Sequence, residues 1–346
     1  MIQRGGEILE FLKALIGTPS LSGQEEKIAE LVFKKMEELG FDQVIRDQMG
    51  NVIGRISGGK GDPIVFDGHM DVVEAGERRN WRFDPFGGET LSGKIYGRGS
   101  VDMKGGLASM IYGCSADEVS VDIYVACVVH EETYEGVALG EVLKGIGRRP
   151  RAVVLGEPTD LNLSIGQRGR CVLRITTRGT TSHSSMPELG RNAIYRMTPI
   201  IEGIERRNED LPSHPLLGKG TMAVTSIRAM PGEGPIIPDR CEILVDRRMT
   251  PGEDLGKILE ELNLLASGAE VELVREKLVC YTGYTIEVEN YFPTWILDEH
   301  HPLIKRSLGA LTDALGSKSE VIVWRFSTDG VTSAGALGIP TIGFGP

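Results

Sequence analysis

The sequence predicts an α/β protein in which a smaller domain is inserted into a larger one. From Pro63 onward, apolar runs of strand length alternate with helical stretches, which is typical of a mixed, mostly parallel sheet with helices on both faces. The middle of the chain instead has the order βαββαβ, which is typical of a ferredoxin-like unit. A length of 346 residues also exceeds what most single hydrophobic cores sustain. We therefore expect residues 1–168 and 281–346 to form a discontinuous domain, and residues 169–280 to be inserted in it.

The elements of the larger domain follow from the spacing of apolar residues. Glu7–Ile16 has the spacing of an amphipathic helix, and a second helix is expected after Ser22, which forms a capping box with Glu25. Downstream we expect strands at Ile64–Phe66, Val121–Val129 and Ala152–Leu155, helices at Lys104–Cys114 and Val137–Leu143, and a continuation of the same alternation over Pro302–Leu315, Glu320–Trp324 and Ile339–Phe344.

The inserted domain is predicted from six consecutive segments. Their apolar periodicity changes between two and 3.6 residues in the order that a ferredoxin-like unit requires. The expected segments are the strand Gly169–Arg178, the helix Asn192–Asn208, the strands Met222–Ala229 and Arg240–Met249, the helix Leu255–Leu265 and the strand Ala269–Val279.

Composition excludes several classes of partner. The chain has 49 acidic and 38 basic residues and a net charge of −11, which argues against nucleic acid or an anionic membrane as a partner, because both require a positive surface. We find no stretch of 18 apolar residues and no secretion signal. The five cysteines are odd in number and include no CxxC pair, which predicts a reducing, cytoplasmic location without disulfides.

Four segments end in side chains that can bind a metal ion. In open α/β sheets the ligand crevice lies at the carboxyl ends of the strands, so we expect these side chains to converge. The four segments are Ile64–Asp71, Gly97–Gly106, Val128–Glu132 and Val154–Pro158.

A mixed set of imidazole and carboxylate groups predicts a divalent metal site. Converging carboxylates repel one another and lose hydration unless a cation gathers them. Such a set suits zinc, with cobalt or manganese as tolerated substitutes. Taken alone, His69 could be structural and Asp102 could cap a helix, and Glu131 and Glu132 could lie in a solvated loop. Their occurrence at successive strand ends favours the metal site, because each separate explanation would have to hold independently.

These motifs resemble those of a known enzyme family over nearly the whole chain. Gly68–Asp71, the Gly97–Gly106 loop and the Glu131-Glu132 pair are similar to the co-catalytic zinc metallopeptidases and deacylases, the family of acetylornithine deacetylase, succinyl-diaminopimelate desuccinylase, aminoacylase and glutamate carboxypeptidase. The similarity extends from Pro19 to Pro346. Within the family, three segments are most similar to a bacterial branch of selenium-metabolism hydrolases: Tyr281–Tyr284, Tyr291–Trp295 and Phe326–Gly330.

The resemblance implies a site for two metal ions in a zinc-peptidase-like catalytic domain. His69 and Glu157 are expected to bind one ion and Glu132 the other, and Asp102 is expected to bridge both. Asp71 lies two residues after His69, on the same face of an extended segment, and is expected to accept the second N–H of the imidazole.

The resemblance also implies metal-assisted hydrolysis of an amide bond, in an N-acyl amino acid or a dipeptide-like substrate. A metal ion lowers the pKa of its bound water from about 15.7 toward about 7. Glu131 is expected to be the general base that takes the proton and later returns it to the leaving amine.

Three further candidates are carried over from the family. His183 resembles a lid histidine that completes the oxyanion site of the partner subunit. Arg248 matches an arginine that binds a substrate carboxylate, a task suited to a planar, bidentate donor. Thr328 is a candidate substrate contact, and Arg247, on the opposite strand face, is expected to be structural. A ferredoxin-like unit leaves an edge strand to cover, so we expect a homodimer through the inserted domain.

The sequence departs from the family at its end. Family members continue past Gly-Phe-Gly-Pro to a histidine that completes the second metal site, whereas this sequence ends at Pro346. We expect the natural chain to be longer. The alternative is a non-catalytic or single-metal ligand-binding relative that lacks the C-terminal histidine. A phosphohydrolase is disfavoured, because no Gly-rich phosphate loop accompanies the motifs.

Overall fold

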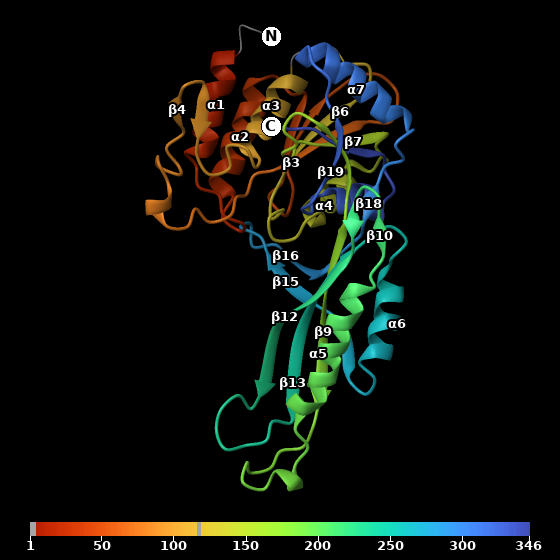
Figure 1. Ribbon diagram of the computed structural model, residues 1–346. Coiled ribbons are helices and arrows are strands. Elements are labelled where there is room, and N and C mark those ends of the chain that lie inside the picture. The colour runs from red at the N-terminus through yellow and green to blue at the C-terminus, as the bar shows by residue number, and fades with distance from the viewer. Residues whose placement is uncertain (1–4, 116–118) are drawn as a thin grey trace. The chain divides into compact units, whose positions relative to one another are not determined.

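The computed structural model describes residues 5–115 and 119–346 (Figure 1). The chain divides into two compact units. The first crossing, after Gly166, lies close to the predicted boundary. The chain then crosses more often than expected, because residues 287–295 return to the second unit. Unit 1 comprises Met1–Gly166, Lys277–Ile286 and Ile296–Pro346, and unit 2 comprises Gln167–Glu276 and Glu287–Trp295.

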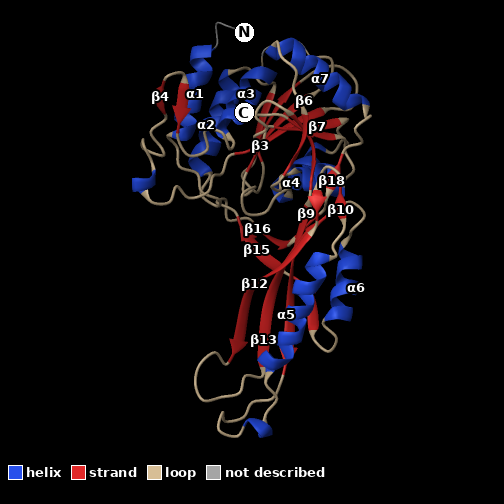
Figure 2. Ribbon diagram, viewed as in Figure 1, coloured by secondary structure: helices blue, strands red, loops and turns tan. Residues whose placement is uncertain are grey.

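A mixed sheet with a parallel centre organises unit 1 (Figure 2). Its order is β1-β2-β6-β3-β7-β20-β8, and β19 also pairs with β8. Strand β3 is parallel to both β6 and β7, and β20 is parallel to β7, whereas the remaining neighbours on this path are antiparallel. The fold class predicted from the sequence is therefore confirmed. The strands are β1 (Gln43–Arg46), β2 (Val52–Ile56), β3 (Ile64–His69), β6 (Ile123–Val128), β7 (Ala152–Leu155), β8 (Leu163–Gln167), β19 (Val321–Trp324) and β20 (Thr341–Gly343).

Helices cover the sheet of unit 1. Helix α2 contacts the strands β1 and β2, α3 contacts β3 and β6, and α4 contacts β6. The buried strand residues Val65, Val125 and Val153 show why the strands are apolar throughout their length, since both faces of the sheet are covered. The helices are α1 (Gly5–Ile16), α2 (Glu26–Glu38), α3 (Lys104–Cys114), α4 (Val137–Ile146), α7 (Pro302–Leu315) and the π-helix η4 (Val331–Ala336).

The predicted capping box at the start of α2 is wrong. The helix begins at Glu26 with Glu25 as its N-cap residue, and no side chain caps it. The hydroxyl of Ser22 instead donates to the carboxylate of Asp71 at 2.6 Å. A tertiary contact thus replaces the local hydrogen bond that the sequence pattern suggested.

Unit 2 is an antiparallel sheet with two helices. The strand order is β12-β13-β9-β14, and β17 also pairs with β9. The burial of β13 alternates between half-buried and buried residues, because α5 packs on one face of the sheet. The elements are β9 (Gly169–Arg178), α5 (Ala193–Glu209), β12 (Thr221–Met230), β13 (Arg240–Met249), α6 (Leu255–Leu265), β14 (Glu270–Leu273) and β17 (Tyr291–Phe292).

One predicted strand is in fact two. The expected strand Ala269–Val279 divides at Val274 into β14 and β15 (Arg275–Val279), and β15 forms a two-stranded sheet with β16 (Thr285–Glu289). Every helix within the described ranges is too short or too polar to span a lipid bilayer. The remaining elements are β4 (Glu89–Leu91), β5 (Lys94–Tyr96), β10 (Ser213–His214), β11 (Gly218–Lys219), β18 (Trp295–Ile296) and the 3-10 helices η2 (Arg78–Asn80) and η3 (Pro187–Leu189).

Candidate metal centre

The acidic and imidazole groups of unit 1 meet at one edge of its sheet. Strands β6, β3 and β7 are adjacent and parallel, so their carboxyl ends lie together. His69 is the last residue of β3, and Glu157 follows β7 by two residues. Glu131 and Glu132 follow β6. Asp102 lies in the loop immediately before α3.

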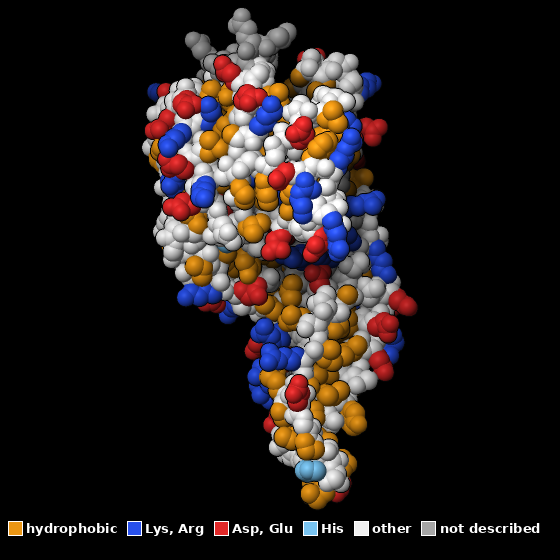
Figure 3. All heavy atoms as spheres, turned by 90° about the vertical axis from the view of Figure 1, so that its left-hand side faces the viewer, with side chains coloured by type: hydrophobic (Ala, Val, Ile, Leu, Met, Phe, Trp, Pro, Cys, Tyr) orange, Lys and Arg blue, Asp and Glu red, His pale blue; other side chains and the backbone are white. Residues whose placement is uncertain are grey.

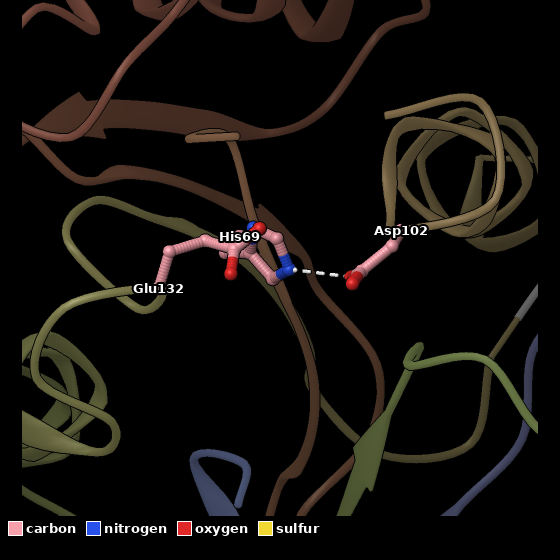
Figure 4. A group of neighbouring side chains, drawn as sticks. All are labelled: His69, Asp102 and Glu132. Carbon is pink, nitrogen blue, oxygen red and sulfur yellow. Dashed lines mark hydrogen bonds and ion pairs between the residues drawn. The ribbon is translucent and has the colours of Figure 1, made fainter. Parts of the chain in front are cut away.

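His69 is the common member of two candidate metal-binding groups. One contains His69, Asp102 and Glu132, and the other contains His69, Glu131 and Glu157. Within each group, the potential ligand atoms all lie within 4.8 Å of one another. Figure 4 shows Asp102 and Glu132 approaching His69 from opposite sides.

The imidazole Nε2 of His69 faces three carboxylates. It lies 3.1 Å from Asp102 Oδ1, 3.7 Å from Glu157 Oε1 and 4.0 Å from Glu131 Oε2. The His69 side chain is only 1% exposed, whereas that of Asp102 is 53% exposed. Asp102 is therefore the solvent-facing member of a mostly buried set.

The second imidazole nitrogen is held by Asp71, but through the main chain. Nδ1 of His69 lies 2.8 Å from the carbonyl oxygen of Asp71, and 3.6 Å from its carboxylate. Because a carbonyl oxygen can only accept a hydrogen bond, Nδ1 carries a proton, and Nε2 is the nitrogen that would bind a metal ion once its own proton is displaced. The expected tautomer is thus fixed by the Asp71 backbone.

The carboxylate of Asp71 is fully buried and binds the loop after β6 instead. It accepts the backbone N–H groups of Glu131 and Glu132, each at 3.2 Å, and the hydroxyl of Ser22 at 2.6 Å. Asp71 therefore orients two acidic residues of the site as well as His69.

Burial and like charge shift the pKa values of the site. Burial, followed by the charges of Asp102 and Asp329, raises the pKa of Glu157 to about 8, although His69 opposes this shift. Burial and the charge of Glu157 also raise the pKa of Glu131 well above its usual range. Burial by itself lowers the pKa of His69, but Glu157 and the hydrogen bond to Asp102 outweigh it, and the pKa is raised well above 6.5.

A divalent cation fits this donor set. Oε1 of Glu131 is buried and has no hydrogen-bond partner among the described residues. Buried carboxylates that repel one another are stabilised when a cation compensates their charge. One imidazole and several carboxylates are ligand types that zinc and its neighbours accept, and His69, Asp102, Glu132 and Glu157 are the residues that would hold the ions.

Sequence reasoning missed a second pair of acidic residues behind the site. Asp67, two residues before His69 on β3, hydrogen-bonds Asp329, and both are buried. Asp329 also accepts the backbone N–H of Gly136, the N-cap residue of α4. The sequence could have placed Asp67 beside the site, because it lies two residues before His69 and residues two apart on a strand share a face. For Asp329 only the tertiary contact reveals it.

The three substrate-site candidates have different surroundings. In unit 2, His183 lies in an exposed loop with Nδ1 2.8 Å from the Ser185 hydroxyl. Also in unit 2, Arg248 forms an ion pair with Asp246 at 2.8 Å. Thr328 is fully buried in unit 1, next to Asp329. The structure therefore brings together His69, Asp71, Asp102, Glu131, Glu132 and Glu157, while His183 and Arg248 belong to the other unit.

Fold and site together define an α/β protein with a candidate metal centre and a second, ferredoxin-like unit. Comparison with known proteins identifies the family. The model of "Peptidase family M20/M25/M40" matches residues 65–346. The chain belongs to this family of metallopeptidases.

Individual relatives agree with this assignment. The chain is 37% identical over 350 residues to the uncharacterized protein YgeY of Escherichia coli K12, covering 98% of this chain and 86% of that protein. It is 27% identical over 289 residues to succinyl-diaminopimelate desuccinylase of Bordetella petrii, covering 77% of this chain and 74% of the enzyme.

Solved structures share the fold. The metallo-carboxypeptidase Sso-CP2 of Sulfolobus solfataricus superimposes with a TM-score of 0.73 at 18% identity, covering 98% of this chain and 91% of that one. YXEP of Bacillus subtilis, described as a dinuclear metal-binding peptidase, gives 0.68 at 17% identity, with 98% and 88% covered. The family-level resemblance is confirmed, and the selenium-metabolism branch stays a prediction.

Proposed function

We propose that this protein hydrolyses the amide bond of a small N-acyl amino acid or dipeptide-like substrate, with two divalent ions, zinc foremost, and Glu131 as the general base. The observation that carries the proposal is the position of Glu131. Its carboxylate is buried, lies 4.0 Å from His69 Nε2 through one oxygen, and leaves the other oxygen without a partner among the described residues.

The bound ions and the residues of the site would have different roles in the reaction. Bound ions would supply Lewis-acid chemistry, lowering the pKa of water and stabilising the negative charge that develops on the carbonyl oxygen. Glu131 takes a proton from the attacking water and delivers it to the leaving amine. The burial that raises the pKa of Glu131 also makes it a stronger base than an exposed glutamate. Its neighbour Glu132 is held by the same Asp71 carboxylate and points to the other ligand group.

The substrate class is supported by the relatives. One relative is named a succinyl-diaminopimelate desuccinylase and one structural neighbour a metallo-carboxypeptidase. Both names imply cleavage of an amide bond formed by an amino acid. We propose that Arg248 binds the substrate carboxylate, exchanging its present partner Asp246, and that Thr328 contributes a contact.

We also propose a homodimer through unit 2, in which His183 serves the partner's site. Strand β12 is an edge of its sheet and pairs with β13 alone among the described strands. Ile227 on β12 is 56% exposed, and Figure 3 shows hydrophobic side chains on the surface. Pairing two copies would cover such an edge. Light scattering that finds only monomers at micromolar concentration would contradict this arrangement.

A cytoplasmic location is part of the proposal. Cys114, Cys127, Cys171, Cys241 and Cys280 are all buried and free. Free cysteines persist where the surroundings are reducing.

The decisive experiment measures metal content and turnover together. Wild-type protein loaded with zinc, cobalt or manganese should hydrolyse at least one member of a panel of N-acyl amino acids and dipeptides, and chelation should abolish turnover. Glu131→Gln should retain the metal and lose about 10²–10⁴-fold in kcat, whereas Glu37→Gln, an exposed control on α2, should match the wild type. A metal-loaded protein that cleaves nothing in the panel would favour a non-catalytic binding protein.

A further inference from the structure

Three consecutive backbone N–H groups in the loop after β6 each donate to a buried carboxylate. Glu131 and Glu132 donate to the two oxygens of Asp71, each at 3.2 Å. The preceding residue, His130, donates to Oε1 of Glu25, also at 3.2 Å. The loop that carries the proposed base is thus held by two acidic residues from separate parts of the chain.

Glu25 is fully buried although it does not cap the helix that follows it. It lies directly before α2, has 0% of its surface exposed, and makes no capping hydrogen bond to the helix. The same Oε1 accepts the backbone N–H of Gly23 at 2.9 Å. A carboxylate is rarely buried unless hydrogen bonds or an opposite charge compensate it, because the loss of its hydration is costly.

The backbone at His130 explains what Glu25 holds. His130 has a φ of +59°, in the left-handed region that residues with a side chain seldom adopt. Such a conformation persists where surrounding contacts enforce it. The turn at His130 sets the direction in which the next two residues leave β6, so that Glu131 joins one ligand group and Glu132 the other.

The two carboxylates are also linked to each other. Ser22, three residues before Glu25, donates its hydroxyl to Asp71 at 2.6 Å. Gly23 has a φ of +83°, and a Cβ there would lie 3.4 Å from the ring of His130. The segment 22–25 therefore packs against His130 and contacts the Asp71 carboxylate within the same unit.

We propose that Glu25 is a positioning residue of the metal centre, which fixes the orientation of Glu131 and Glu132 by holding the backbone of His130. This role rests on the proposed function as far as turnover is concerned, but the hydrogen bonds on which it depends are within the chain and can be tested without turnover. Glu25 belongs to neither of the two candidate metal-binding groups found among the described residues. Its loss should alter the direction of the two glutamates and not the ability to bind substrate.

The test compares two replacements of similar length. Glu25→Gln keeps an oxygen acceptor for the N–H of His130, whereas Glu25→Met fills the same space without one. Glu26→Gln, at the exposed neighbouring position, is the control. The first readout is amide hydrogen exchange of a peptide covering residues 129–135 in metal-free protein, which requires no activity.

Glu25→Met should speed exchange in that peptide about tenfold or more, while Glu25→Gln and Glu26→Gln stay within about twofold of wild type. With metal loaded, Glu25→Met should lower kcat about 10–100-fold, the range for residues that orient metal ligands, and leave KM within about threefold. Its cobalt form should show an altered visible spectrum, and Glu25→Gln should restore both readouts.

Two results would overturn the proposal. One is unchanged exchange in residues 129–135 of Glu25→Met; the other is faster exchange with an unaltered cobalt spectrum and kcat. If Glu25→Met does not fold, Glu25→Asp, which withdraws the acceptor by one methylene, takes its place under the same criteria. Should the wild type hydrolyse no substrate, the exchange and cobalt readouts still decide the matter, so failure of the proposed function is recognised separately.

Discussion

Buried charges are used differently in the two units. In unit 1, Glu131 and Glu157 are both buried. Besides burial, the charge of Glu157 raises the pKa of Glu131, and the charges of Asp102 and Asp329 raise the pKa of Glu157. In unit 2, the fully buried Arg247 faces the opposite charge of Glu253. Burying like charges together costs stability, whereas an opposite pair compensates part of its own desolvation.

The difference distinguishes buried charges of a ligand-binding site in unit 1 from a buried ion pair that stabilises the fold of unit 2. Glu131 keeps an oxygen without a partner among the described residues, as expected of a group arranged for a ligand. Arg247 and Glu253 instead join β13 to the turn that precedes α6, where Glu253 also accepts the N–H and hydroxyl of Thr250. The following predictions test whether the two buried charges differ in this way.

The largest effect is expected at Glu157, where metal should reverse the sign of a substitution. With metal loaded, Glu157→Gln removes a proposed ligand and should lower activity at least about 100-fold, beyond the loss for a residue that only orients a ligand. In metal-free protein the same change should stabilise the fold at alkaline pH. The folded-state pKa of about 8 lies above the ordinary glutamate value of 4.5, so the carboxyl group costs stability as pH rises through this window.

Chemical denaturation at pH 9, with and without zinc, measures this reversal. The expected gain without metal is on the order of 2 kcal/mol. Glu141→Gln, paired with Lys144 on α4, is the control. Destabilisation of the metal-free protein by Glu157→Gln would show that the carboxylate stabilises the fold and would contradict its role as a metal ligand.

The second prediction concerns Arg247 in unit 2. Arg247→Met should destabilise the protein by about 3–5 kcal/mol, because it leaves the charge of Glu253 without its partner. The adjacent Arg248→Met, whose ion pair is partly exposed, should cost less than about 1 kcal/mol. Urea denaturation distinguishes them, and equal losses would mean that burial of the arginine does not matter.

Glu25 provides a prediction about pH. Burial, with the charge of Asp71, raises its pKa to about 7 from 4.5. The folded state therefore binds more protons than the unfolded state between these values, and the contribution of Glu25 to stability should fall by on the order of 2 kcal/mol as pH rises from 4.5 to 7. Glu25→Gln should flatten that part of the stability curve. An unchanged slope, measured by thermal unfolding against pH, would contradict the shift.

The smallest effect is expected at Arg248. Arg248→Lys keeps the charge but loses the planar fork, so KM for a substrate with a free carboxylate should rise about tenfold, with kcat and stability nearly unchanged. A substrate analogue whose carboxylate is amidated should show no such difference between the two proteins. If both substrates respond equally, Arg248 supports the strand and does not bind the carboxylate.

The sequence predicted the elements of the fold closely where the signal was local. Strand β7 and helix α3 begin and end where apolar spacing placed them, and β9 and β13 do as well. The residues of the candidate metal centre were also identifiable, because each follows a buried strand or precedes a helix in a distinctive motif. Their approach to one another in the structure agrees with that reasoning.

What failed were inferences that treated a long-range contact as a local one. Ser22 and Glu25 have the spacing of a capping box, but both side chains turn away from α2 toward Asp71 and His130. The expected acceptor of the imidazole N–H was the side chain of Asp71, whereas the structure uses its carbonyl. Asp67 and Asp329 were missed altogether.

The amino-acid sequence by itself determined which residue types stand at the ends of the strands, since periodicity and motif spacing are properties of adjacent residues. Only the tertiary structure decided which oxygen of which carboxylate faces His69, and which acids hold the loop after β6. The physical reason is that hydrogen bonds and desolvation depend on atoms brought within a few ångströms of each other. Residues such as Glu25 and His130 are 105 positions apart in the chain.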